Sequence, residues 1–177
     1  MAYHSFVGSS EPVSKASARV EAYGAVDETN ACIGLVRLHT EGELDAILSR
    51  IQNDLFDLGA DLATPDTGKD LGYEPLRIVE AQVERLEREI DRLNGELSPL
   101  NSFILPAGTP AAAHLHLART VCRRAERGLV ALMAEDETVS AAALKYLNRL
   151  SDLLFVAARF ANGKGADDVL WVPGGSR

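Results

Sequence analysis

The hydrophobic residues of this chain recur mostly at spacings of three and four positions, which is the period of an amphipathic α-helix. The strict alternation of apolar and polar residues that is typical of a half-buried strand does not occur. Helix-ending signals divide the pattern: Pro65 follows the second segment, Asn94 and Gly95 end the third, and Gly163 follows the last. The pattern therefore predicts five helices, at about residues 18–38, 42–63, 75–94, 110–134 and 140–162.

The predicted architecture is a single all-α domain, an up-and-down bundle of five helices. Residues 1–17 are expected to form an irregular N-terminal segment, and residues 163–177 a C-terminal tail. The third segment carries a clear amphipathic stripe, and its fewer than three heptads favour packing within the chain over a coiled coil. That stripe consists of Leu76, Val79, Val83, Leu86, Ile90 and Leu93.

Composition narrows the classes of function. The 177 residues carry a formal net charge of −8, which argues against general nucleic-acid binding and restricts any polyanion site to a local basic cluster. No apolar run is long enough to span a membrane, and the first residues lack the order of a secretion signal. Cys32 and Cys122 lie in predicted helices and resemble small buried hydrophobes rather than a disulfide framework. We therefore expect a cytoplasmic protein.

Four arginines and a glutamate interrupt the apolar pattern of the fourth predicted helix. At about 100° per residue, Arg119, Arg123, Glu126 and Arg127 fall on one side of that helix. Guanidinium groups beside a buried face usually require an anion, and phosphate matches their fork-like geometry. A solvated face with surface ion pairs is an equally weighted alternative on composition alone. The apolar residues that we expect in the core around them are Leu115, Leu117, Ala118, Val121, Leu129, Val130 and Leu132.

Polar residues also interrupt the apolar pattern of two other predicted helices. In the fifth, Lys145, Asn148 and Asp152 share one face, and the arginines of the fourth helix are candidate partners for Asn148 and Asp152. In the first, Asp27 lies among small residues that allow another helix to approach closely. Arg119 is its candidate partner, either within the chain or across a subunit contact. Ordinary polar groups of a bundle are the simpler alternative for Asn148 and Asp152.

Other catalytic patterns are absent from the sequence. His114 and His116 are two positions apart and point to different faces of a helix, so they do not suggest a metal-binding pair. The Glu-x-x-His pattern of a di-iron bundle, a glycine-rich phosphate loop and zinc-ligand spacings do not occur either. Residue spacing alone thus predicts a helical bundle with an anion-binding pocket.

Four long motifs occur in order at residues 19–30, 51–63, 103–127 and 144–152, among them Glu21-Ala-Tyr-Gly-Ala-Val-Asp27 and Leu144-Lys-Tyr-Leu-Asn148. Together with residues 169–174 they resemble the cobalamin adenosyltransferase family of the propanediol-utilisation type, over roughly residues 15–174. The resemblance implies a homotrimer of five-helix bundles with an active site at each subunit interface. It also implies transfer of the 5′-deoxyadenosyl group of ATP to the cobalt of cob(I)alamin, with release of triphosphate. Mg²⁺ bound through the phosphates is the expected metal.

The resemblance also implies roles for individual residues. Phe103 matches the aromatic residue that displaces the lower axial base of cobalamin, and Asp152 matches a residue near the corrin. Arg119 and Asp27 match an ion pair across the interface, which places them beside the reacting groups and Asp27 near cobalamin. A cobalamin reductase and an adenosylcobalamin-dependent enzyme are the implied protein partners. The implied ATP-binding residues are Lys15, Arg123 on the phosphates, Arg124, Glu126, Arg127 and Asn148.

The chain departs from the family pattern near its start, where the segment that wraps the triphosphate is absent before Lys15. Three explanations compete: a truncated sequence, a functional substitute formed by residues 1–12, and a non-catalytic paralogue that binds corrinoid or nucleotide. A purely structural bundle is disfavoured, because it has no use for Lys15, Arg123, Glu126 and Asn148 together. Ala107, where the family commonly has glycine, matters if the backbone there needs a positive φ.

Overall fold

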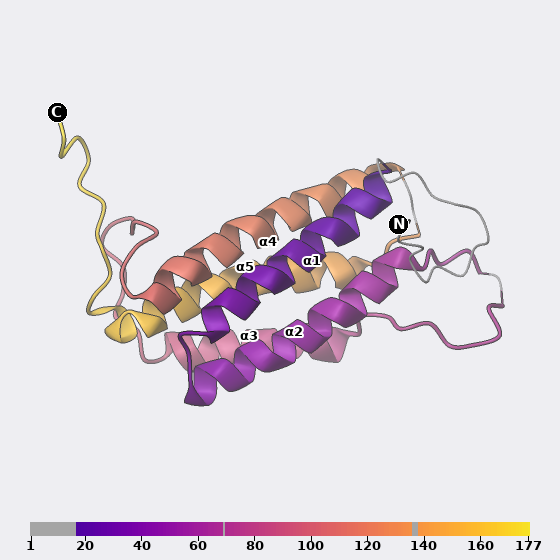
Figure 1. Cartoon of the computed structure of the whole chain (residues 1–177), viewed down its shortest axis with the longest axis horizontal. Coiled ribbons are helices and arrows are strands. Elements are labelled where there is room, and N and C mark those ends of the chain that lie inside the picture. The colour runs from indigo at the N-terminus through magenta and orange to yellow at the C-terminus, as the bar shows by residue number, and fades with distance from the viewer. Residues whose placement is uncertain (1–16, 69, 136–137) are drawn as a thin grey trace.

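The computed structural model describes residues 17–68, 70–135 and 138–177, and within them five α-helices form one elongated bundle (Figure 1). α1 packs along α2 and α4, while α5 packs along α3 and α4. In this part of the chain the only strand-like pairing is an antiparallel bridge between Ile104 and Leu170. The predicted all-α bundle is confirmed. The helices are α1 (Ala18–Arg37), α2 (Gly42–Ala63), α3 (Glu80–Asn94), α4 (Pro110–Glu135) and α5 (Ala141–Ala161), with the 3₁₀ turn η1 (Gly163–Gly165) after them.

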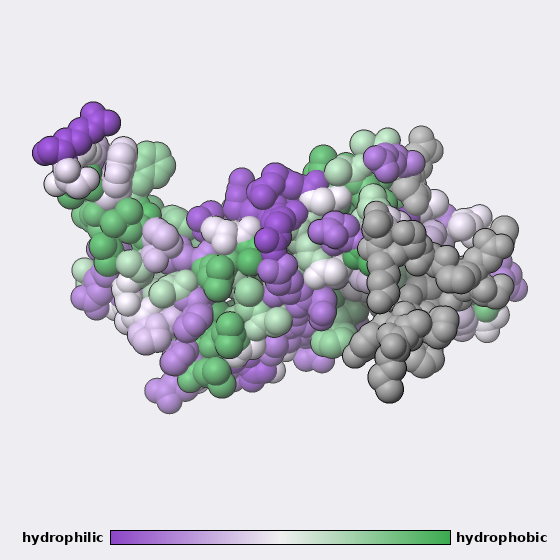
Figure 2. All heavy atoms as spheres, turned by 45° about the horizontal axis from the view of Figure 1, so that its top comes forward, coloured by the Kyte–Doolittle hydropathy of each residue, from purple (hydrophilic) through white to green (hydrophobic). Residues whose placement is uncertain are grey.

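The end of the bundle at which α5 finishes also holds the segment 95–109 and the C-terminal residues (Figure 1). The loop from α3 to α4 passes over this end, and the chain leaves it again after η1. Figure 2 shows hydrophobic residues gathered on the C-terminal projection at this end. Two segments that are distant in sequence, residues 95–109 and the C-terminal residues, therefore meet beside the start of α4 and the end of α5.

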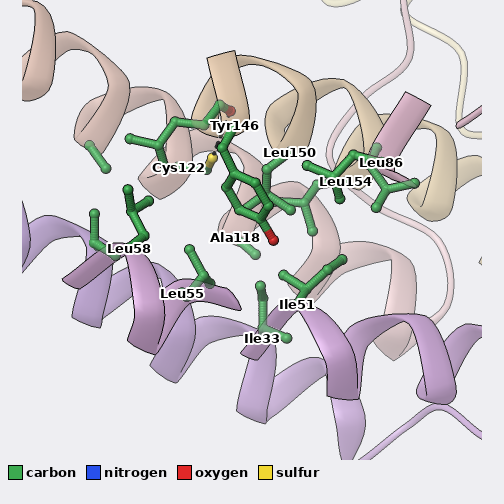
Figure 3. Close-up of a cluster of buried hydrophobic side chains, with 14 of the residues drawn as sticks. Ile33, Ile51, Leu55, Leu58, Leu86, Ala118, Cys122, Tyr146, Leu150 and Leu154 are labelled. Carbon is green, nitrogen blue, oxygen red and sulfur yellow. Dashed lines mark hydrogen bonds between the residues drawn. The ribbon is translucent and has the colours of Figure 1, made fainter. Parts of the chain in front are cut away.

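Figure 3 shows part of the hydrophobic core, to which side chains from all five helices contribute. Tyr146 is fully buried there, and its hydroxyl donates a hydrogen bond to Asp54 Oδ2 at 3.0 Å. Asp54 also accepts a hydrogen bond from Gln82 at 2.9 Å and forms an ion pair with Arg85. Burial raises the pKa of Tyr146, so the hydroxyl stays protonated and able to donate. This polar cluster joins α2, α3 and α5.

The third helix begins at Glu80, five residues later than the expected start near Pro75. Asp61 on α2 explains the delay, because its Oδ2 accepts a hydrogen bond from the backbone N–H of Ile78 at 2.9 Å, and its Oδ1 pairs with Arg77 at 2.8 Å. These contacts hold the chain in an extended path up to the N-cap residue of α3. The predicted amphipathic stripe is therefore correct from Val83 onward. It is wrong for the two residues that precede α3, because Leu76 is 60% exposed and Val79 is 54% exposed.

In the sequence, Thr109 followed by Pro110 is the pattern of an N-cap residue with proline at the first helical position, and α4 begins there. The Thr109 side chain accepts a hydrogen bond from the N–H of Ala112 at 3.2 Å, as an N-cap residue does. The prediction that Leu117 and Val130 of α4 lie in the core is wrong, because their side chains are about half exposed. Among the described non-glycine residues only Lys164 has a positive φ, so the alanine at position 107 causes no backbone strain.

The cysteines differ in their surroundings. Cys122 is fully buried and its thiol donates to the Leu147 carbonyl at 3.4 Å, whereas Cys32 is only partly buried; both are free thiols. Burial raises the pKa of each thiol, which keeps both protonated.

None of the helices in the described ranges combines the length and the apolar character that a membrane span requires.

Candidate functional site

A cavity of about 590 Å³ lies between α4, α5 and the segment that follows α3. Two arginines of α4, Arg119 and Arg123, reach it from one side, and Asp152 of α5 reaches it from the other. Apolar groups complete the wall, so a ligand here would contact charges set beside a hydrophobic surface. The lining residues are Asn94, Leu97, Ser98, Pro99, Leu100, Arg119, Arg123, Ser151, Asp152, Phe155, Val156 and Arg159.

Arg119 is the most informative group of this cavity. Its side-chain Nε is buried and has no hydrogen-bond partner in the described structure, although guanidinium groups stay charged in proteins. Burial first, and the neighbouring charge of Arg123 second, lower the pKa of Arg119. A buried donor without an acceptor costs about 1–3 kcal/mol, and more when it is charged. No described group of the cavity accepts a hydrogen bond from the Arg119 Nε, although Asp152 lines the same cavity.

His116 stands one turn before Arg119 and is 2% exposed. Its Nε2 is likewise buried without a partner, and its ring packs edge-on against Phe155, with centroids 6.3 Å apart. Burial, and then the charge of Arg119, lower the pKa of His116 against the opposing effect of Asp168. The histidine is therefore neutral at pH 7 and adds no charge beside the arginines.

The remaining arginines of the α4 cluster, at positions 123, 124 and 127, are exposed. Arg124 forms an ion pair with Glu28 of α1 across the surface of the bundle. Glu126 is half-buried and accepts a hydrogen bond from Asn148 Nδ2 on α5 at 2.7 Å. The structure thus brings together the two implied ATP-binding residues Glu126 and Asn148, one turn beyond the arginine pair of the cavity.

The expected partners of the polar residues on α5 need correction. Lys145 pairs with Glu80 of α3 at 3.0 Å, and Asp152 pairs with Arg149 of its own helix at 3.4 Å. Arg149 also donates to Asn148 Oδ1 at 2.7 Å. Asn148 and Asp152 thus contact Arg149 of their own helix, and Asn148 also contacts Glu126, instead of the α4 arginines. Asp152 nevertheless lines the cavity with those arginines.

Phe103 projects from the segment before α4 and is 77% exposed. Its ring meets that of Trp171 edge-on, with centroids 5.9 Å apart, and its carbonyl accepts a hydrogen bond from the Trp171 N–H at 2.8 Å. An exposed aromatic pair of this kind is an apolar contact surface that no other described residue covers. Lys15, the implied phosphate-binding lysine, lies outside the described residues.

Asp27 lies elsewhere, in a second cavity of about 360 Å³ between α1 and α2. Asn30 lines the same cavity, and its Oδ1 is buried without a partner. Arg119 and Asp27 line different cavities, and no ion pair between described residues joins them, so the single chain does not pair them. A contact between Asp27 and Arg119 of different subunits stays a prediction.

Sequence reasoning missed Arg159, Ser98 and His116 as parts of the cavity region. For Arg159 a signal was present, since this arginine stands within the apolar run that ends α5. Ser98 lies in an irregular segment, where periodicity carries no information. No group of three or more potential metal ligands gathers in the described ranges, so the residues present do not form a protein-built metal centre.

Comparison with known proteins identifies the family. The family model for cobalamin adenosyltransferase matches residues 4–161. The corrinoid adenosyltransferase of Mycobacterium tuberculosis is 51% identical over 168 residues, which cover 93% of this chain and 86% of that protein. The corrinoid adenosyltransferase of Bacillus subtilis is 45% identical over 161 residues, which cover 88% of this chain and 80% of that protein.

Solved structures agree with the sequence relatives. A variant of the PduO-type ATP:corrinoid adenosyltransferase from Lactobacillus reuteri, complexed with cobalamin and ATP, superposes with a TM-score of 0.78 at 39% identity, covering 90% of this chain and 88% of that one. Another variant of that enzyme, complexed with ATP, gives a TM-score of 0.82 at 38% identity, covering 92% of each chain. The sequence, the bundle and the relatives therefore agree that this chain belongs to the cobalamin adenosyltransferase family.

Proposed function

We propose that this protein transfers the 5′-deoxyadenosyl group of ATP to cob(I)alamin and releases triphosphate. The observation that carries the proposal is the cavity in which Arg119 and Arg123 stand together and the Arg119 Nε has no acceptor. Family membership supplies the matching reaction, since relatives that bind ATP and cobalamin cover about nine-tenths of the chain.

The reaction determines what the chain must supply. Cob(I)alamin is itself a strong nucleophile, so no general base is needed. The protein must place C5′ of ATP in line with cobalt and stabilise the charge that develops on the departing triphosphate. Arg123 suits the phosphates because its guanidinium is exposed at the cavity and can donate in a fork. We assign Lys15, Arg124 and Arg127 to the same anion and the Glu126–Asn148 pair to the nucleoside end.

Mg²⁺ is the expected metal of the bound nucleotide. The ion would neutralise charge on the triphosphate. The described residues include no cluster of three potential ligands, which fits an ion held mainly by phosphate oxygens and water. The chain's own contribution is then the arginine row, which holds the phosphates.

The corrin side uses different residues. Phe103 offers an exposed ring that can cover the lower face of cobalt and exclude the axial base and water. We place Asp152 near the corrin because it lines the same cavity as the arginines. Asp27 would reach Arg119 of a neighbouring subunit, which requires an oligomer; the family resemblance favours a homotrimer.

The nature of the released product tests this proposal. ³¹P NMR of a mixture of this protein, ATP, Mg²⁺ and reduced cobalamin is expected to show intact triphosphate accumulating with the adenosylated corrinoid. Diphosphate and monophosphate as primary products would indicate a different reaction. Bound cobalamin with unchanged ATP would support the alternative, a non-catalytic corrinoid carrier.

A further inference from the structure

A buried ion pair lies at the end of the bundle that holds Phe103. Arg159 Nε of α5 donates to Asp168 Oδ2 at 2.8 Å, and the two side chains are only 7% and 3% exposed. Charged side chains this deeply buried are rare unless they are paired. Neither residue belongs to the arginine cluster of α4, and neither has a role in the proposed reaction so far.

Arg159 and Asn162 extend this ion pair to two other segments. Arg159 Nη2 donates to the Ser98 carbonyl at 2.8 Å, in the wall of the large cavity. Asn162, fully buried at the end of α5, donates to the Ala107 carbonyl at 3.2 Å and accepts from the Thr109 N–H at 2.9 Å. The network therefore fastens the cavity wall and the start of α4 to the end of α5.

The backbone around the network is built to fit it. Gly108 has φ +107°, and a Cβ there would lie 2.2 Å from the side-chain oxygen of Asn162. Gly165 has φ +90°, and a Cβ there would lie 3.0 Å from Arg159 Nη2. Only glycine adopts these conformations without strain and leaves the space open. The close approach of both loops to Arg159 and Asn162 thus depends on glycine at two positions.

After Asp168, residues 169–172 pass alongside the segment that carries Phe103. The Val169 carbonyl accepts from the Leu105 N–H at 2.7 Å, and the Trp171 N–H donates to the Phe103 carbonyl at 2.8 Å. Apolar burial does little to hold this segment, since its four side chains are between 38% and 67% exposed: Val169, Leu170, Trp171 and Val172. The buried ion pair at Asp168 is therefore its main attachment to the bundle.

We propose that Arg159, Asp168 and Asn162 are positioning residues that hold the Phe103–Trp171 aromatic pair in a set place relative to the arginine cavity. The same guanidinium contacts the cavity wall at Ser98 and the residue from which the Phe103-bound segment starts. The nucleotide side and the corrin side of the site are thereby held at a fixed position relative to each other. The consequence for catalysis rests on the proposed function, because it uses the assigned role of Phe103.

Trp171 gives a direct readout, since it is the only tryptophan of the chain. In Asp168→Asn, we expect a red-shifted Trp171 emission and at least a twofold rise in acrylamide quenching, with unchanged helical circular dichroism. The matched control is Asp167→Asn, which removes an exposed neighbouring carboxylate and is expected to match the parent. Parent-like fluorescence in Asp168→Asn would overturn the attachment.

A second variant keeps the test valid if Asp168→Asn disturbs the bundle. Ser102→Ala removes the hydrogen bond from Ser102 Oγ to the Trp171 carbonyl, 3.1 Å long, without touching the core. It should shift Trp171 emission in the same direction by a smaller amount. A shift in Ser102→Ala as large as that in Asp168→Asn would contradict the ion pair as the main attachment of the segment.

The catalytic consequence has its own measurement. With cob(II)alamin and ATP bound, we expect Asp168→Asn to lower the fraction of four-coordinate cob(II)alamin, seen by electron paramagnetic resonance, at least threefold. The KM for ATP should change less than twofold. A fluorescence shift without a change in cobalt coordination would overturn the positioning role. If the parent protein binds no cobalamin, the proposed function fails, and the fluorescence measurement alone decides the attachment.

Discussion

Two adjacent carboxylates on α1 make a sharp test of the subunit contact. Glu28 pairs with Arg124 within the chain, whereas Asp27 lines the α1–α2 cavity away from Arg119. Arg119 itself keeps a buried Nε without an acceptor. If Asp27 of one subunit supplies that acceptor to its neighbour, then Asp27→Asn leaves a partly buried guanidinium without its counter-charge.

The size of the effect follows from the exposure of each pair. Removing one partner of a buried ion pair costs roughly 3–5 kcal/mol, and the half-buried state of Arg119 points to the lower end. About 3 kcal/mol per interface corresponds to a roughly 100-fold weaker contact. The Glu28–Arg124 pair is 52% and 53% exposed, so Glu28→Gln is expected to cost less than about 1 kcal/mol.

Analytical ultracentrifugation across a range of protein concentrations measures this difference. We expect the assembly of Asp27→Asn to dissociate at a concentration at least about 100-fold higher than that of the parent, because every interface of the assembly is weakened. The Glu28→Gln control should dissociate near the parent concentration. Equal assembly of all three proteins, with unchanged cobalamin affinity in Asp27→Asn, would refute the pairing of Asp27 with Arg119.

Three further variants test individual residues. Arg123→Ala should lower the transfer rate by at least 100-fold while the assembly stays intact, because phosphate contacts are lost; parent-like kinetics would remove Arg123 from the phosphates. Phe103→Ala should slow the reaction that starts from cob(II)alamin much more than the one from pre-reduced cob(I)alamin, and equal slowing would exclude base displacement. The pKa of His116 lies below its ordinary value of 6.5, so below pH 6.5 the unfolded chain binds more protons and stability falls as the pH is lowered. Thermal unfolding of His116→Gln should therefore depend less on pH in that window than unfolding of the parent, and an unchanged pH dependence in this variant would contradict the reasoning.

Helix positions could be predicted where the signals were local. The second predicted helix, residues 42–63, matches α2, and Thr109 caps α4 as its position before Pro110 indicated. The start of α3 could not be predicted, because a carboxylate 17 residues away, Asp61, holds the N–H of Ile78. Periodicity continues through Leu76 and Val79, although the backbone there is not helical.

The types of residue in the candidate site could be predicted from the sequence, but the contacts between residues far apart in the sequence could not. The spacing of Arg119 and Arg123 indicated an anion pocket, and both line the large cavity. The Arg159–Asp168 pair was missed because Arg159 looked like a single charge in an apolar helix and Asp168 like a tail residue. Asn162 stands at the end of the fifth predicted helix, and its side chain accepts a hydrogen bond from the N–H of Thr109, 53 residues earlier. Such contacts between distant loops leave no periodic signal.

The most direct test of the central claim is an anaerobic assay of this 177-residue chain with ATP, Mg²⁺ and chemically reduced cob(I)alamin, followed by corrin absorption. We expect ATP-dependent conversion to a light-sensitive adenosylcobalamin spectrum. The absence of conversion while cobalamin still binds would contradict an adenosyltransferase and favour a corrinoid carrier.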